Sequence, residues 1–268
     1  MKKPSVFRLV RCGFLAASLV ALLAAHAAEA VTLTWDANGS LGGSGTWDTN
    51  TTVNWWNGSG RVVWPTPGGL SEGAIFGGTA GVVTLSGVTA NNLTFNTTGY
   101  TLASGTLTLN GSTPTISAGS GIAATISSSI AGTSGLVKVG AGLLTLSGSN
   151  TYTGGTTIAN GGTISIGSDA SLGTAPATAT AGSLLIDGGA TLATTATFTL
   201  NANRGIVIGP NSGTGSGTLD VAVGTILSYG GIITSNGSGT GGLTKAGGGT
   251  LVLSGSNLYT GPPFPLAR

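Results

Sequence analysis

The sequence predicts an all-β protein whose short strands wind into the stacked coils of a parallel β-helix. A passage of twenty residues occurs twice, at 135–154 and 242–261, with fourteen identical positions and no gap, and internal repeats are typical of stacked architectures. In the first copy Leu144 and Leu146 alternate with Thr145 and Ser147, which is the period-two pattern of a strand. No window of eleven or more residues after residue 30 has helical periodicity.

The composition favours coiled strands over disorder. The 268 residues include 50 glycines and only 6% charged residues, which alone would suit a disordered chain. However, 40% of the residues are hydrophobic, and the strand-like runs carry Leu, Ile or Val at alternate positions. In a β-helix each coil buries one row of these side chains, exposes Thr and Ser, and turns at Gly and Asn. We expect on the order of ten coils of about 20 residues each.

Residues 1–30 have the three parts of a secretory signal peptide. Four basic residues precede an apolar run over 14–25, and an Ala-Glu-Ala cleavage site ends at residue 30. The apolar run is too short for a membrane-spanning helix. Its removal also takes away the only Cys and the only His, and it leaves five basic and six acidic residues, a formal charge of −1. We therefore expect no imidazole or thiolate metal site, no cofactor and no nucleic-acid partner.

Residues 31–72 form a tryptophan-rich region that precedes the regular strands. We expect this region to cap the open end of the coil stack with large rings. A second interpretation is a glycan-binding platform, because exposed indoles stack on the apolar faces of sugar rings. The tryptophans concerned are Trp35, Trp47, Trp55, Trp56 and Trp64.

Residues 73–261 carry the regular strand pattern of the predicted β-helix. The runs follow one another with turn residues between them. They lie at 82–88, 92–95, 106–111, 124–130, 163–167, 183–189, 206–209, 218–224, 225–228 and 251–255.

The duplicated passage supplies the residues to which we assign a scaffold role. We expect Lys138 and Lys245 to lie on strands facing water, where lysine discourages lateral sheet pairing, and Tyr152 and Tyr259 to pack coil on coil. The full set is Leu136, Lys138, Gly140, Gly142, Leu144, Leu146, Asn150 and Tyr152 in the first copy, and Leu243, Lys245, Gly247, Gly249, Leu251, Leu253, Asn257 and Tyr259 in the second.

Both copies of the passage resemble the autotransporter-associated β-strand repeat, also called the passenger-associated repeat. The resemblance covers 135–167, which is the first copy with the strand pair that follows it, and 242–261. The resemblance implies a right-handed parallel β-helix that is exported as the passenger of an autotransporter and displayed on the cell or released from it. It brings no catalytic residues. The sequence departs from the family pattern after Gly261, where residues 262–268 form a Pro-rich tail. The family's C-terminal membrane barrel is not recognisable, so we also consider a truncated, non-functional fragment of a larger autotransporter.

Carboxylates are the remaining candidates for catalysis, since glycoside hydrolysis needs two of them held roughly 5–10 Å apart. Asp169, Asp187 and Asp220 are widely spaced in the sequence, and we expect each to lie in a solvated turn or cap. A β-helical polysaccharide hydrolase or lyase that uses these residues is the alternative to a non-enzymatic role.

The sequence thus predicts a secreted or cell-surface structural and adhesive module of a Gram-negative type of bacterium. We expect no catalytic activity and no membrane-spanning segment in the mature chain. The expected partner is an extracellular glycan or the surface of a host or neighbouring cell.

Overall fold

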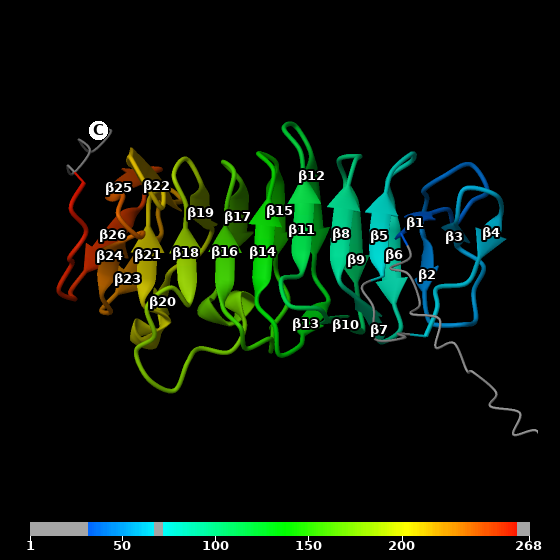
Figure 1. The fold of residues 1–268 in the computed structure, drawn as a ribbon, viewed down its shortest axis with the longest axis horizontal. Helices are drawn as coiled ribbons and strands as arrows, with labels where there is room; N and C mark the ends of the chain where they lie inside the picture. Colours follow the sequence, from blue (N-terminus) through cyan, green and yellow to red (C-terminus); the bar gives the residue numbers. More distant parts are fainter. Residues whose placement is uncertain (1–31, 67–71, 262–268) are drawn as a thin grey trace, which may run out of the picture.

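The described part of the chain, residues 32–66 and 72–261 of the computed structural model, winds into a parallel β-solenoid. This confirms the predicted fold class. Figure 1 shows the strands side by side in rows along the long axis, with the N-terminal strands at one end and the C-terminal strands at the other. The predicted signal peptide (1–30) and Pro-rich tail (262–268) lie outside the described residues, and the hand of the coil stays a prediction.

Two long parallel ladders form two faces of the solenoid, because each coil adds one short strand to each. The first belongs to an eleven-stranded sheet and contains β1 (Thr32–Trp35), β5 (Gly73–Phe76), β8 (Asn92–Phe95), β11 (Thr115–Ala118), β14 (Leu136–Val139), β16 (Thr156–Ile158), β18 (Leu184–Ile186), β21 (Ile206–Ile208) and β24 (Ile233–Ser235). The second is a nine-stranded sheet of β2 (Gly45–Trp47), β6 (Val82–Leu85), β9 (Tyr100–Ala103), β12 (Ala123–Ile126), β15 (Leu143–Leu146), β17 (Thr163–Ile166), β19 (Thr191–Thr194), β22 (Thr214–Val221) and β25 (Thr240–Ala246).

The third face is interrupted in the middle of the molecule. Two separate three-stranded parallel sheets form it, β7 (Val88–Ala90), β10 (Thr106–Leu109) and β13 (Ser129–Ala131), and then β20 (Phe198–Leu200), β23 (Ile226–Tyr229) and β26 (Thr250–Leu253). Two 3₁₀ turns, η1 (Asp169–Leu172) and η2 (Ala202–Arg204), lie in the connecting segments. Every strand run predicted from the sequence overlaps at least one of the strands.

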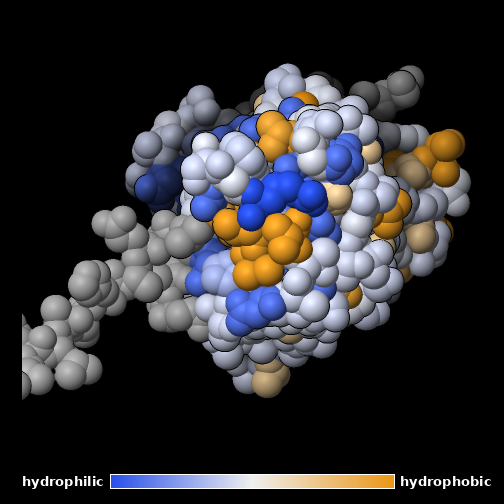
Figure 2. All heavy atoms as spheres, turned by 90° about the vertical axis from the view of Figure 1, so that its right-hand side faces the viewer, coloured by the Kyte–Doolittle hydropathy of each residue, from blue (hydrophilic) through white to orange (hydrophobic). Residues whose placement is uncertain are grey.

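The N-terminal end departs from the parallel pattern. β3 (Trp55–Trp56) pairs antiparallel with β1, and β4 (Arg61–Val62) pairs antiparallel with β3. These strands lie beside the first coil and cover the edge that it would otherwise expose. Figure 2 looks onto this end and shows an apolar patch next to strongly hydrophilic residues. The parallel ladders already begin at β1 and β2, within the tryptophan-rich region.

The core consists of columns of side chains from equivalent positions of successive coils. In the nine-stranded sheet the backbone pairs Leu102 with Ile126, Ile126 with Leu146, and Leu146 with Ile166. All four side chains are buried, so each aliphatic group packs on the coil before it and the coil after it. The alternation read from the sequence is confirmed, since Leu144 and Leu146 are buried while Thr145 is half-buried and Ser147 exposed.

The two copies of the repeated passage occupy different faces of the solenoid. The first copy contributes β14 to the eleven-stranded sheet and β15 to the nine-stranded sheet. The second copy contributes β25 to the nine-stranded sheet and β26 to the third face. The same residues therefore pack in two different surroundings.

Candidate functional site

Four of the five tryptophans form a buried aromatic cluster. Trp35, Trp47, Trp55 and Trp64 are each 0% exposed, and the ring centroids of Trp47 and Trp55 lie 4.9 Å apart in an edge-on arrangement. Phe76 extends the cluster toward the next coil. Because these rings have no face in solvent, they do not form the glycan-stacking surface of the second interpretation. They fill the interior at the end of the solenoid.

Trp56 is the partly exposed tryptophan, because it alternates with buried Trp55 along β3. Trp56 and the loop after β1 line a hollow of about 250 Å³, together with Asp36, Gly39, Ser40 and Leu41. We call this hollow the Trp56 pocket. The indole supplies one part of the lining, and the short loop after β1 supplies the rest.

An ion pair supports the loop of the Trp56 pocket from behind. Asp36 is 3% exposed, and its Oδ1 accepts a hydrogen bond of 2.8 Å from the backbone N–H of Leu41. Its Oδ2 lies 3.5 Å from Nε of Arg61. The Nη2 of Arg61 donates to the backbone carbonyls of Asp36 and Ala37. The two charges hold the loop in one place and neutralise each other.

The repeat lysines differ from the expectation that both face water. Lys138 is 0% exposed and stands in an aliphatic column, where the backbone pairs it with Ile116 and Ile158. Its Nζ donates to the carbonyls of Val139 at 2.8 Å and Gly140 at 2.6 Å. Burial lowers the pKa of Lys138 to about 8. The expectation is wrong for Lys138, because Leu136 two residues earlier is buried and strand alternation places both side chains inward.

Lys245 is half-buried and repeats the local contacts of Lys138 on another face. Its Nζ donates to the carbonyls of Ala246 at 3.1 Å and Gly247 at 2.8 Å. Gly140 and Gly247 have φ of 78° and 69°, a conformation that favours glycine. We call this unit, in which a lysine binds the carbonyls of the next two residues, the Lys-x-Gly turn.

The first repeat copy carries two further buried polar side chains. Asn150 accepts from the N–H of Ile130 at 2.8 Å and donates to the carbonyl of Ser171 at 2.6 Å. It thereby links the coil before it to the coil after it. The hydroxyl of Tyr152, which is 0% exposed, lies 2.7 Å from Oγ1 of Thr156, and burial raises the pKa of Tyr152 to about 12.

The remaining repeat positions are less buried in the second copy. In the first copy Leu136, Gly142, Leu144 and Leu146 are buried and Gly140 is half-buried. In the second copy Leu243 is buried, Gly249, Leu251, Leu253 and Tyr259 are half-buried, and Gly247 and Asn257 are exposed. The reason is position, because β25 and β26 are the last strands of their sheets among the described residues.

The candidate catalytic carboxylates lie on different elements of the fold. Asp169 forms a two-point ion pair with Arg204, at 2.7 Å to Nε and 2.9 Å to Nη2, and Arg204 is 1% exposed. Asp187 accepts from the N–H of Gly188 in its own turn. Asp220 lies half-buried on the outward side of β22. Among the described residues no three His, Cys, Asp or Glu side chains are grouped as a metal site would require.

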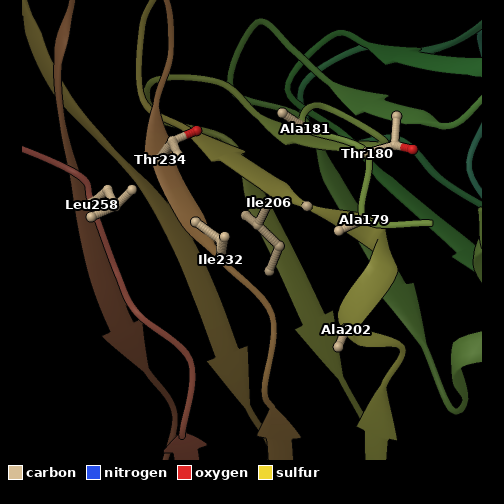
Figure 3. Close-up of a pocket in the computed structure, with 9 residues that line it drawn as sticks. Ala179, Thr180, Ala181, Ala202, Ile206, Ile232, Thr234 and Leu258 are labelled. Atoms are coloured by element: carbon tan, nitrogen blue, oxygen red, sulfur yellow. The ribbon is translucent and has the colours of Figure 1, made fainter.

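A second hollow, of about 220 Å³, lies near the C-terminal end of the eleven-stranded sheet. Figure 3 shows Ile206, Ile232 and Leu258 turned toward one another, with Ala179, Ala181 and Thr180 on a neighbouring loop. Leu258 is 62% exposed and Ile232 is 45% exposed. The hollow is apolar and carries no charged group in its lining.

The repeats match a known protein family, and half of the chain is similar to a known protein. Residues 136–166 and 243–262 match the family described as passenger-associated-transport-repeat, which confirms the resemblance seen in the sequence. A stretch of 145 residues is 47% identical to the protein named "Adhesin BmaC autotransporter" of Brucella suis biovar 1 (strain 1330), and it covers 50% of this chain and 4% of that protein. No solved structure matches the chain. None of the helices in residues 32–66 and 72–261 has the length and hydropathy to cross a membrane.

Proposed function

We propose that this chain, which carries two passenger-associated transport repeats, is an adhesive, non-catalytic module that is exported and displayed on, or released from, the surface of a Gram-negative bacterium. The observation that carries the proposal is the 47% identity, over half of the chain, to a segment of a protein named as an autotransporter adhesin. The parallel solenoid supports it, because a rod of stacked coils offers a long lateral surface for contact.

The outer surface favours many weak, uncharged contacts. Thr163, Thr191, Thr218 and Thr244 are backbone partners in successive coils of the nine-stranded sheet, and strands in a sheet lie about 4.8 Å apart. All four side chains are half-buried, so they form an outward row of hydroxyl and methyl groups. A neutral, repeating partner fits such a row better than a strongly charged one.

The placement of the carboxylates supports a non-catalytic role. Asp169 is held by buried Arg204, and the carboxylate of Asp187 binds its own turn. Both carboxylates are therefore engaged in local structural contacts, whereas glycoside cleavage needs a pair of carboxyl groups that act as acid and as base or nucleophile.

The test uses the exported chain, purified and coupled to fluorescent beads. Beads that carry the folded chain should be retained on cultured cells or on immobilised polysaccharide more strongly than beads that carry the heat-unfolded chain. Equal retention of the two bead types would contradict the adhesive role. In parallel, release of reducing ends from polysaccharide by the wild type, and its loss in Asp169→Asn, Asp187→Asn or Asp220→Asn, would establish an enzyme instead.

A further inference from the structure

We propose that the Trp56 pocket is a subsite for a single neutral pyranose ring. This inference deepens the proposed adhesive function and rests on it for its biological meaning, but the binding itself can be measured without any adhesion assay.

The indole of Trp56 supplies the stacking surface. The backbone pairs Trp56 with Thr34 on one side and with Arg61 on the other, so its side chain lies on the outward face while Trp55 points into the core. A partly exposed indole presents a large apolar face with a polar edge. The axial C–H groups of a pyranose ring give the complementary apolar surface.

Leu41 lines the Trp56 pocket in a conformation that leucine rarely adopts. Its φ is 61° and its side chain is 39% exposed, although a left-handed backbone favours glycine. The strain is maintained by the structure around it, since the carbonyl of Leu41 accepts from the N–H of Thr79 in the next coil and its N–H is held by Asp36. Strained residues that are fixed in this way are enriched at binding sites.

The loop after β1, which contains Leu41, is held by backbone hydrogen bonds before any ligand binds. The N–H of Gly42 donates to the carbonyl of Trp35, and the N–H of Gly43 donates to the carbonyl of Thr79 at 2.6 Å. A Cβ at Gly42 would lie 2.2 Å from the oxygen of Thr79, which shows how closely the loop packs on the next coil. A rigid site loses little conformational freedom on binding.

The charge of the pocket indicates a neutral ligand. Asp36 is the ionised group in its lining, and it is paired with Arg61 of β4. An anionic sugar would have to compete with buried Asp36 for Arg61, and a cationic sugar would have to compete with Arg61 for Asp36. Neither competition arises for an uncharged hexose.

One polar side chain in the lining remains available for a sugar hydroxyl. The Oγ of Ser40 makes no hydrogen bond within the described residues. Gly39, with φ of 76°, is exposed and has no side chain to block approach. A volume of about 250 Å³ lies just below the usual range for drug-sized ligands, about 300–1,000 Å³, and suits one ring.

The test is saturation-transfer difference NMR on the whole exported chain. The probes are the methyl pyranosides of glucose, galactose, mannose and N-acetylglucosamine, with glucuronate and glucosamine as charged comparisons. We expect transfer to the ring protons of at least one neutral probe, with a Kd in the millimolar range that is typical of small contacts, about 1–10 mM. The charged comparisons should bind about tenfold more weakly.

Three variants locate the site. Trp56→Thr should reduce binding about tenfold, while Trp56→Tyr, which keeps an aromatic face, should retain it. Val223→Thr is the matched control, because Val223 is an apolar side chain that is 82% exposed elsewhere on the solenoid. Leu41→Gly should weaken binding without lowering the melting temperature, since glycine accepts the positive φ.

Each result bears on one proposal alone. Absence of transfer to every neutral probe, or equal transfer with Trp56→Thr, would overturn the pyranose subsite. If wild-type beads adhere and Trp56→Thr beads adhere equally, adhesion stands and the subsite is not its contact. If a methyl pyranoside binds but wild-type beads do not adhere, the subsite stands and the adhesive function falls.

Discussion

The Nζ of Lys138 lies 2.6 Å from the carbonyl oxygen of Gly140, two residues further along the same chain. The ammonium group therefore caps a turn of its own strand from the inside of the solenoid. The same relationship joins Lys245 to Gly247 at 2.8 Å, on a different face. The Lys-x-Gly turn is thus a local structure that does not depend on which sheet it enters.

Replacing Lys138 by Met tests the contribution of this cap. Methionine suits the aliphatic column, but it leaves the carbonyls of Val139 and Gly140 without their donor, and an unpaired buried polar group costs about 1–3 kcal/mol. We expect Lys138→Met to lower the free energy of unfolding in urea by about that amount. Lys245→Met is the matched control and should cost less than about 1 kcal/mol, because water reaches that turn. Equal effects of both variants would contradict the role of burial.

The lowered pKa of Lys138 makes stability depend on pH in a defined direction. In the unfolded chain a lysine titrates near pH 10.4, whereas in the folded chain its pKa is about 8. Between these values the unfolded state binds more protons, so stability rises as pH rises. Below pH 8 both states are protonated and this lysine adds no slope.

Urea unfolding at pH 7.5 and pH 9.5 measures this effect. From pH 7.5 to pH 9.5 we expect the free energy of unfolding of the wild type to rise by on the order of 1–2 kcal/mol relative to that of Lys138→Met. The upper end of the pH window is kept below pH 10, because burial raises the pKa of Tyr100 and of Tyr152 to about 12. Above pH 10 the unfolded tyrosines ionise first and stability falls again. A wild type and variant with parallel pH profiles would refute the assignment.

The ion pair of Asp169 and Arg204 should be structural. Asp169→Asn leaves the guanidinium of Arg204, 1% exposed, without its counter-charge. Removing one partner of a buried pair costs about 3–5 kcal/mol, and the partial exposure of Asp169, 26% of its side chain, places the expected loss nearer about 2–3 kcal/mol. Asp187→Asn, whose carboxylate serves a turn, should change stability by less than about 1 kcal/mol. A smaller loss for Asp169→Asn than for Asp187→Asn would contradict this ranking.

The two asparagines of the repeat give a comparison within one chain. Asn150 is 6% exposed and bonded to the coils on both sides, so Asn150→Ala should cost about 2–4 kcal/mol. Asn257 is exposed, and the free energy of unfolding of Asn257→Ala should lie within about 0.5 kcal/mol of that of the wild type. Thermal unfolding of both variants measures the difference. Similar melting temperatures would show that the links made by Asn150 do not stabilise the stack.

Much of this architecture could be predicted because alternation and turn residues are local signals. Strand positions and the inward side of Leu144 and Leu146 follow from the period-two pattern alone. The same pattern also contained the correct placement of Lys138, since Leu136 and Lys138 share one side of β14. The expectation went wrong where the charge of lysine was weighed above its position in the alternation.

Other features depend on contacts that no local pattern carries. The sequence groups the tryptophans, but only the antiparallel turn back through β3 decides that Trp55 is buried and Trp56 is accessible. The Trp56 pocket likewise needs Arg61 and Asp36, which are far apart in the sequence, to meet. The pairing of Asp169 with Arg204 spans 35 residues and has no counterpart in the repeat.

The different faces taken by the two repeat copies have a consequence for how such chains lengthen. The backbone partners of Leu136 and Thr156 follow at intervals of 20 and 28 residues, so loops absorb large differences in coil length. A duplicated segment therefore need not add a whole number of turns, because each copy carries its own turn cap and its own inward row. The two copies show that one segment can enter the stack at two phases of the winding, with loops of different length completing the coil on either side.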